Sequence, residues 1–426
     1  MFITILLFFA VCLVFLYDYK RKRSDRWKKL SEFPGDTPLP LFGNGLQLGF
    51  DADESSHKQL TLWEKHGKQT FRFSVGSEDW VLLTDPDDIG VYSLIKYKSS
   101  LMGIESNKLL NPDDPYLEAS EKVIRIITYN FFSYWRNIDF LFSLTPQYTE
   151  MMETIKTIKQ TSSEIIETRR EILTKIIKKT QSNNKNVDID LEKIIENKLN
   201  NVGCLLDKLL LSKSADGKPT PDDVINEELS LLCFTGHYTT TMTISHTLYC
   251  LAKYPKIQDR VFEEQQSIFN ENLQKKPTNN ELNQMKYLEA VIKESIRVIP
   301  TVTKIGRQLK NDLTLKDGRV VPAGISVIIF YEAAFKNPKV FPEPEKYIPE
   351  RFLNPMHAYA FVPFSAGRRN CIGFRFAWVA MKATLSNILR RYEVLPGEPG
   401  TEPQFVGRII TESKNGLRVK LKKRIL

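Results

Sequence analysis

The segment that most constrains this chain is FVPFSAGRRNCIGFRF, residues 361–376, in which one cysteine stands among closely spaced glycines and arginines. The pattern predicts a loop that enters a helix near Ile372. At a helix N-terminus, the helix dipole and nearby arginines favour the thiolate form of Cys371. Gly367 permits a tight turn, and Gly373 permits close approach of a flat ligand. A soft thiolate in this position suits a metal centre, and haem iron is one candidate.

Phe364 can shield that sulfur from water, whereas an isolated cysteine is more often a small buried apolar side chain. The remaining cysteines are scattered and lack C-x-x-C spacing, which indicates neither a zinc site nor a disulfide framework: Cys12, Cys204, Cys233 and Cys250. The histidines show no metal-ligand spacing and no support for Ser–His–Asp catalysis: His57, His66, His237, His246 and His357.

The formal charge of +9 is concentrated at one place. The chain has 426 residues, with 60 Lys and Arg against 51 Asp and Glu. Residues 20–29, KRKRSDRWKK, carry seven basic side chains and one acidic one, so only +3 remains for the other 416 positions. A basic face that contacts phosphates is therefore not expected, and we expect no nucleic-acid partner.

The N-terminal residues 2–17, FITILLFFAVCLVFLY, are apolar and uncharged. A cleaved signal peptide would carry its positive charges before the apolar run, and a buried core helix would show a polar stripe. A membrane anchor needs about 17–25 apolar residues, and the positive-inside rule then places the body in the cytosol. We expect an anchor, a transmembrane helix, at residues 1–19. Residues 20–45 are expected to be a basic flank that contacts lipid headgroups, followed by a Pro-rich hinge.

The body is expected to be mainly α-helical with small β-sheets, an α+β class. Strands are predicted at 71–75, 80–84 and 325–330, with a hairpin over 313–321 and a closing hairpin near 407–421 that turns at Asn415 and Gly416. Helices are predicted within 116–211 and at 220–253 and 279–299. The middle of the second, FTGHYTTT at 234–241, is a poor helix interior by propensity. Either the backbone or the hydroxyls serve a function there, or the segment is a tolerated polar stripe.

Three motifs, taken together, resemble those of the cytochrome P450 family. The haem-thiolate signature F-x-x-G-x-R-x-C-x-G is filled by Phe364, Gly367, Arg369, Cys371 and Gly373. The family's E-x-x-R is matched by Glu294 and Arg297, which share a helix face. The P-E-R-F motif is matched at residues 349–352, where Arg351 resembles the third member of a buried Glu–Arg–Arg network that braces the haem loop.

The resemblance covers the anchor, the hinge and nearly everything from residue 116 onward, and it is greatest to the fatty-acid ω-hydroxylase clan with its insect members. It implies a cytochrome P450-like fold with haem b as cofactor and a catalytic domain at residues 46–426. Cys371 would be the axial ligand of the iron, and Arg369 and Arg307 would pair with the haem propionates. Thr239 matches the oxygen-activating threonine, with Thr240 and Tyr238 beside it at the catalytic centre.

The central helix departs from the clan's F-E-G-H-D-T-T-T at two positions. Tyr238 stands where the clan has Asp, and tyrosine, with an ordinary pKa near 10, is a poor proton relay. Thr235 stands where the clan has the Glu that can esterify haem, so a covalent haem link is not expected.

The W-x-x-x-R helix of the family is also missing, because no tryptophan is followed by arginine four residues later: Trp27, Trp63, Trp80, Trp135 and Trp378. Residues 108–112, KLLNP, resemble the sequel of that helix, and residues 114–119, DPYLEA, resemble a segment that should come much later. A block is therefore expected to be absent near 107–116, which would remove a propionate clamp, part of the substrate wall and part of the electron-donor surface.

Two functions follow from the resemblance. The first is an endoplasmic-reticulum monooxygenase whose catalytic domain faces the cytosol and which oxidises an apolar small molecule (a fatty acid, a hormone-like lipid or a xenobiotic). It would use O₂ and electrons from NADPH–cytochrome P450 reductase, with cytochrome b5 as an optional second donor. The alternative is a haem- or ligand-binding family member without monooxygenase turnover, a haem-thiolate isomerase being one form.

Overall fold

The computed structural model describes residues 2–40, 42–48, 52–75, 78–83, 115–132, 139–183, 205–213, 217–270 and 272–424. The chain divides into two compact units. The first comprises residues 1–97, 131–134 and 239–426, and the second comprises residues 98–130 and 135–238. Helix α10 (Asp222–Lys253) contributes to both, the first unit taking the part from Thr239 onward. The expectation of a missing block near 107–116 falls almost wholly on residues outside the described ones, since α5 begins at Pro115.

The first unit holds every strand of the described chain. Its helical elements are α1 (Phe2–Arg23), α2 (Asp25–Leu30), η1 (Gly45–Leu48), α3 (Ala52–Lys65), α11 (Pro255–Phe269), α12 (Asn279–Gln284), α13 (Lys286–Val298), α14 (Tyr331–Ala334), η4 (Pro349–Leu353) and α15 (Phe374–Arg391). Its strands are β1 (Phe71–Val75), β2 (Glu78–Leu83), β3 (Lys304–Gln308), β4 (Leu313–Thr314), β5 (Val320–Val321), β6 (Ser326–Phe330), β7 (Tyr392–Pro396), β8 (Phe405–Gly407), β9 (Thr411–Ser413) and β10 (Val419–Lys423).

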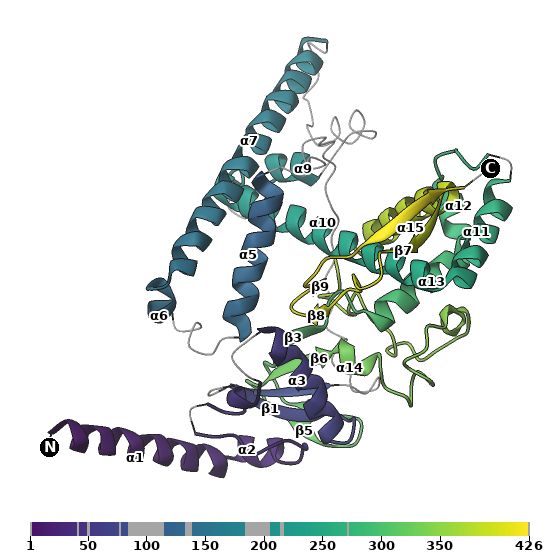
Figure 1. Cartoon of the computed structure of the whole chain (residues 1–426). Helices are drawn as coiled ribbons and strands as arrows, with labels where there is room; N and C mark the ends of the chain where they lie inside the picture. The colour runs from purple at the N-terminus through teal and green to yellow at the C-terminus, as the bar shows by residue number, and fades with distance from the viewer. Residues whose placement is uncertain are drawn as a thin grey trace. The chain divides into compact units, whose positions relative to one another are not determined.

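The largest sheet has the order β1-β2-β6-β3 (Figure 1). Strands β1 and β2 pair antiparallel, β2 and β6 pair parallel, and β3 pairs antiparallel with β6. The main apolar core collects buried residues from α13, α15 and β6, among them Val291, Leu385 and Ile329. β3 lies at the edge of the sheet, and its pairing with β6, a strand of this core, fixes its position.

The named elements of the second unit are all helices in its described part: α5 (Pro115–Phe132), α6 (Asp139–Ser143), α7 (Pro146–Asn183), α9 (Leu205–Leu211) and the first part of α10. Helices α5 and α7 lie side by side (Figure 1), and a Lys122–Glu150 ion pair joins them at 3.1 Å. α7 and α9 are joined by Arg169, which donates two hydrogen bonds to the buried carboxylate of Asp207 at 2.6 and 2.7 Å.

The mainly helical class with small sheets is confirmed, and the strand pair at 71–84 and the helix at 220–253 form where they were expected. The helix expected at 279–299 is two helices broken at Met285. The break arises because the Glu264 carboxylate accepts hydrogen bonds from the N–H groups of Tyr287 and Leu288 (2.6 and 3.0 Å) and so starts a new helix there. α11 was not foreseen. Pro255 is the first residue of this helix, a position that suits proline.

The closing hairpin expected over 407–421 is wrong. β8 pairs with β9, and β10 pairs with β7, the strand that follows α15. The turn at Asn415 and Gly416 is held against an earlier segment, because the Asn415 side chain donates to the Glu402 carbonyl at 2.8 Å and accepts from the Gln404 N–H at 2.8 Å. Because Asn415 bonds to residues 402 and 404, the segments on either side of this turn do not pair with each other as a hairpin.

The expected anchor is helical, since α1 spans Phe2–Arg23, although the side chains of residues 1–11 lie outside the described ones. Across the part of the chain that the structure describes, no helix has both the length and the apolar character needed to span a membrane.

His246 on α10 is 1% exposed and sits edge-on to the Phe405 ring at 5.4 Å. Neither ring nitrogen has a hydrogen-bond partner among the described residues. Burial lowers the pKa of His246 from 6.5 to about 4, because the charged imidazolium would lose its hydration. The folded protein therefore holds this imidazole neutral.

We predict that His246 makes the fold acid-sensitive. As the pH falls from 6.5 to 4, the unfolded state takes up a proton that the folded state does not, so the free energy of unfolding falls by up to about 3 kcal/mol. In His246→Leu this part of the pH dependence should disappear, as measured by urea unfolding from neutral pH to about pH 4. An unchanged slope in the variant would contradict the prediction.

Candidate haem-thiolate site

The loop before α15 is closed by its own backbone. The Cys371 N–H donates to the Phe364 carbonyl at 2.8 Å, and the Asn370 N–H donates to the Gly367 carbonyl at 3.3 Å. Gly367 has φ +80°, a left-handed conformation that favours glycine, as the sequence pattern predicted for a tight turn. α15 begins at Phe374 rather than near Ile372, so the cysteine precedes the helix.

Cys371 is an exposed residue, and it lines a cavity. Burial raises the pKa of Cys371, and a backbone hydrogen bond from Gly373 lowers it only in part. Burial therefore outweighs the bias toward thiolate that was expected at the helix N-terminus. Coordination to a metal would deprotonate such a thiol outright.

The cavity has a volume of about 230 Å³ and is lined entirely by residues of the first unit. Apolar atoms form most of its surface. Its apolar residues are Ile296, Val302, Ile305, Tyr331, Pro363, Phe364, Ala377 and Met381, and its polar residues are Thr239, Thr240, Thr243, Thr301, Ser365, Arg307, Arg369 and Cys371. Phe364 also packs on the Trp378 ring at 5.8 Å, which holds it beside the cysteine.

Two arginines bring positive charge to this mainly apolar cavity. Arg307 lies on β3 opposite Val327, and its guanidinium donates to the carbonyls of Gly306 (2.7 Å) and Arg369 (3.3 Å). Among the described residues, neither Arg307 nor Arg369 forms an ion pair with a carboxylate. A thiol, two such guanidinium groups and apolar walls fit haem, an apolar macrocycle that carries two carboxylates and needs a soft axial ligand.

The structure brings Thr239 and Thr240 to the cavity, but Tyr238 is not among its lining residues. The Tyr238 ring is buried and stacks on Phe234 at 5.9 Å. Gly236 has room around it, since an added Cβ would meet no described atom within 4 Å. The described protein therefore does not itself require the glycine.

Thr243 and Thr301 are among the lining residues that sequence reasoning missed. The Thr243 hydroxyl donates to the Thr239 carbonyl at 2.9 Å and lies 2.8 Å from the Thr301 hydroxyl. Thr243 follows Thr239 by four residues and so shares its helix face, a spacing that could have identified it. Thr301 lies 58 residues further along the chain, and no local pattern indicates its position.

Glu294 and Arg297 form a fully buried bidentate pair, with both side chains 0% exposed and N–O distances of 2.8 and 2.9 Å. Arg297 also donates to three backbone carbonyls, and the Ile348 N–H donates to Glu294 at 2.7 Å. Arg351 approaches Glu294 at 3.6 Å without a hydrogen bond from its Nε, and its Nη2 donates to the Glu343 carbonyl instead. The three side chains thus meet as the sequence motifs predicted, with Arg351 as the weakest member. The carbonyl acceptors of Arg297 belong to Phe335, Pro344 and Lys346.

Comparison with known proteins agrees with this geometry. A family model described as Cytochrome P450 matches residues 97–418. The chain is 36% identical to Cytochrome P450 4d2 of Drosophila melanogaster over 334 residues, which are 76% of this chain and 63% of that protein. It is 34% identical to Cytochrome P450 4c3 of the same organism over 73% of this chain and 58% of that protein. The chain belongs to the cytochrome P450 family.

A further relative, Probable cytochrome P450 4e1 of Drosophila melanogaster, is 27% identical over 483 residues, covering 93% of this chain and 88% of that protein. The family and the similarity to insect members are confirmed. The chain spans less than two thirds of the length of Cytochrome P450 4d2 and 4c3.

We predict that Glu294→Gln destabilises the fold strongly, because it leaves the Arg297 charge buried without its partner. The free energy of unfolding should fall by about 3–5 kcal/mol, as measured by urea denaturation. The matched control is Glu393→Gln, which breaks the exposed ion pair with Lys422 and should leave the unfolding midpoint unchanged. Equal effects in the two variants would show that the buried pair does not hold the fold.

Proposed function

We propose that this protein is a haem-thiolate monooxygenase that oxidises an apolar small molecule. The observation that carries the proposal is the meeting, in one mainly apolar cavity, of the Cys371 thiol with Arg307 and Arg369. When bound, haem b would supply oxygen activation, in which one atom of O₂ enters the substrate and the other becomes water with two electrons from NADPH.

The residues of the chain have separate tasks in this proposal. The Cys371 sulfur would hold the iron, and Arg307 and Arg369 would neutralise the two haem carboxylates. Phe364 would exclude water from the sulfur. The hydroxyls of Thr239 and Thr240 stand at the cavity wall and would hold a proton there for delivery to the reacting centre.

We assign electron delivery to NADPH–cytochrome P450 reductase, with cytochrome b5 as an optional second donor, by analogy with the family. The apolar lining supports a fatty acid, a hormone-like lipid or a xenobiotic as substrate. The catalytic domain would be residues 46–426, facing the cytosol.

We assign residues 1–19 to a membrane anchor in the endoplasmic reticulum. The support is the apolar sequence of the segment and the helix that it forms. The described part of this helix exposes several apolar side chains: Leu13, Phe15, Leu16 and Tyr17.

A second function is favoured by Tyr238, which replaces an acid and lies buried against Phe234. In this alternative the protein binds haem or a ligand without monooxygenase turnover. The alignment with Cytochrome P450 4e1 supports a missing internal block, because it runs over 483 positions whereas 93% of this chain is about 396 residues. The loss of that block would weaken the hold on haem and on the electron donor.

The first test is the carbon monoxide difference spectrum of the reduced, haem-supplemented protein. We expect the thiolate-type Soret shift, and we expect Cys371→Ser to abolish it because oxygen replaces the soft axial ligand. Cys250→Ser is the matched control, since that buried thiol lies outside the cavity lining. Absence of the shift in the unmutated protein would rule out haem-thiolate chemistry.

The second test concerns Tyr238. We predict that Tyr238→Asp raises the coupling of NADPH oxidation to product formation severalfold, because a carboxyl beside Thr239 can relay protons near neutral pH. Tyr238→Phe controls for loss of the phenol and should not raise coupling. If coupling in Tyr238→Asp equals that of the unmutated protein, Tyr238 is not the limiting replacement.

A further inference from the structure

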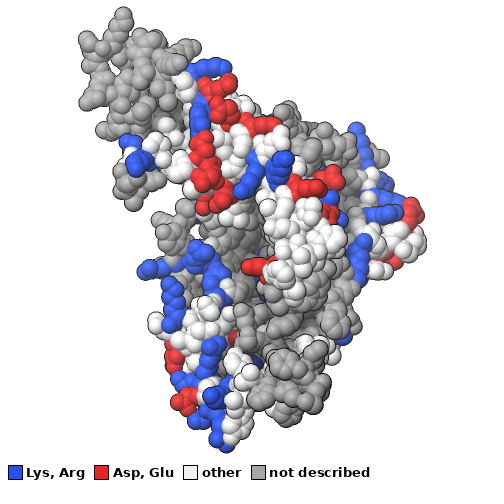
Figure 2. Space-filling view, turned by 90° about the vertical axis from the view of Figure 1, so that its left-hand side faces the viewer, with Lys and Arg blue, Asp and Glu red and all other residues white. Residues whose placement is uncertain are grey.

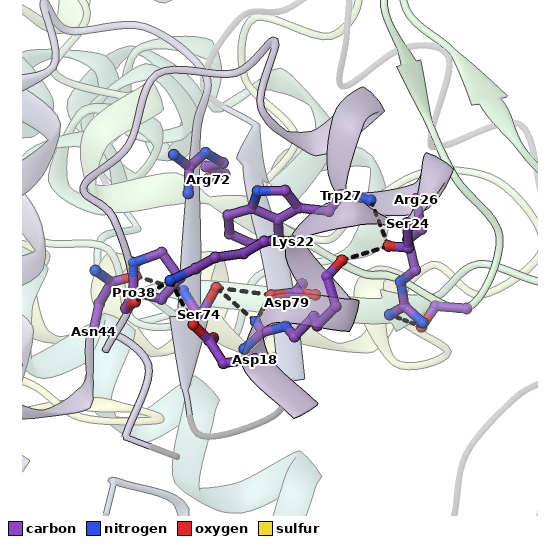
Figure 3. Close-up of polar contacts among 12 residues, drawn as sticks. Asp18, Lys22, Ser24, Arg26, Trp27, Pro38, Asn44, Arg72, Ser74 and Asp79 are labelled. Carbon is purple, nitrogen blue, oxygen red and sulfur yellow. Dashed lines mark hydrogen bonds and ion pairs between the residues drawn. The ribbon is translucent and has the colours of Figure 1, made fainter. Parts of the chain in front are cut away.

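The basic segment at residues 20–29 is bound to the body of its own unit. Lys29 forms an ion pair with Asp312 at 2.6 Å, and Arg26 donates to the Gly324 carbonyl at 3.2 Å. Lys22 donates to the Pro38 carbonyl at 3.4 Å (Figure 3). These charges were expected to contact lipid headgroups, yet several of them have protein partners.

Arg21 is the most deeply placed of these charges. It forms an ion pair with Asp79 in which the side chains are only 11% and 8% exposed. Asp79 also accepts a hydrogen bond from the Ser74 hydroxyl at 2.8 Å, and these two residues face each other across the β1–β2 register. The Asn44 side chain in turn accepts from the Ser74 N–H at 3.0 Å (Figure 3). The Asp79 carboxylate is therefore held in place by bonds other than the one to Arg21.

Trp27 adds a second attachment beside the first. The guanidinium carbons of Arg21 and Arg72 lie 5.2 and 4.9 Å from the Trp27 ring centre, within the range of cation–π contacts. Arg72 is itself held by the carbonyls of Gly35 and Asp36, at 3.0 and 3.2 Å. The Trp27 ring thus packs against two arginines whose side chains are fixed by other residues: Arg21 by Asp79, and Arg72 by the two carbonyls.

The joint between α1 and α2 contains no flexible linker. Ser24 alone separates the two helices, and its hydroxyl accepts a hydrogen bond from the Trp27 N–H at 3.2 Å and caps α2. Just beyond, Leu30 and Phe33 are 1% exposed in the main core. The Pro-rich hinge expected within residues 20–45 takes part in these attachments, since Gly35, Asp36 and Pro38 supply carbonyl acceptors to them.

We propose that the Arg21–Asp79 pair and the Trp27 stack hold α1 rigidly on the β1–β2 strand pair, so that α1 and the first unit move as one piece. The function of this joint rests on the proposed membrane anchoring, because it would fix the angle at which the body meets the bilayer. Lys20, Arg23, Arg26 and Lys28 are exposed and remain able to face headgroups. In Figure 2, basic side chains predominate in the lower part of the view, the level at which Figure 1 places α1 and α2.

The test is limited trypsin digestion of the full chain in phosphatidylcholine–phosphatidylserine vesicles, with cuts mapped by mass spectrometry. In Asp79→Asn, we expect cleavage within residues 20–23 to speed up by about tenfold or more, because the released segment can enter the protease. The control is Asp312→Asn, which breaks the exposed pair with Lys29 on the same segment and should change the rate by less than about twofold.

A second variant separates loss of the joint from a general loss of folding. The double substitution Arg21→Met with Asp79→Leu removes both charges while keeping apolar volume, so its unfolding midpoint should stay near that of the unmutated protein. Cleavage at 20–23 should remain fast in it. Equal cleavage rates in Asp79→Asn and Asp312→Asn would overturn the proposal. If the same digestion pattern appears in detergent while vesicles fail to bind the protein, the rigid joint stands and the membrane anchoring is wrong.

Discussion

The buried pair of Glu294 and Arg297 is the interaction on which the rest of the first unit depends. An unpaired charge at either position would be costly in this apolar core, so both must be present and oriented. Arg297 uses its remaining N–H groups on carbonyls between residues 335 and 346, and Glu294 accepts from the N–H of Ile348. One pair on one helix turn thus helps to fix a long irregular stretch of the chain.

That irregular stretch leads to the loop that presents Cys371, so the position of the thiol depends on it. The loop adds its own constraints through the Phe364 carbonyl and the left-handed Gly367. The opposite wall comes from the threonines of α10, and β3 brings in Arg307 through its pairing with β6. The cavity is therefore assembled from three elements: the cysteine loop, α10, whose Thr243 hydroxyl contacts that of Thr301, and β3, which strand pairing positions.

Sequence analysis was most successful where the functional residues belong to motifs with a fixed spacing along the chain. Cys371 belongs to a motif with fixed residue spacing, and Glu294 and Arg297 are three positions apart on one helix. Both could therefore be identified from the sequence without a structure. The pairing of β10 with β7, the Thr243–Thr301 contact and the Arg21–Asp79 pair join residues that are 23 or more positions apart, and nothing local encodes them. The basic run at 20–29 was interpreted by composition alone, which counts charges but does not identify buried acceptors. Asn415 and Gly416 carry a turn signal that is real, but the partners of the flanking segments lie elsewhere.

The pairing of β10 with β7 also determines when this part of the fold can be completed during synthesis. Residues 419–423 complete the sheet that follows α15, and Arg424 donates to the carbonyls of Leu389 and Arg391 at the end of that helix. During synthesis the cysteine loop leaves the ribosome well before these residues do. The last carbonyls of α15 therefore gain these partners only after translation has passed residue 424. The helix that follows the cysteine loop thus reaches its final packing late, and a cofactor that needs a rigid cavity would bind after that point.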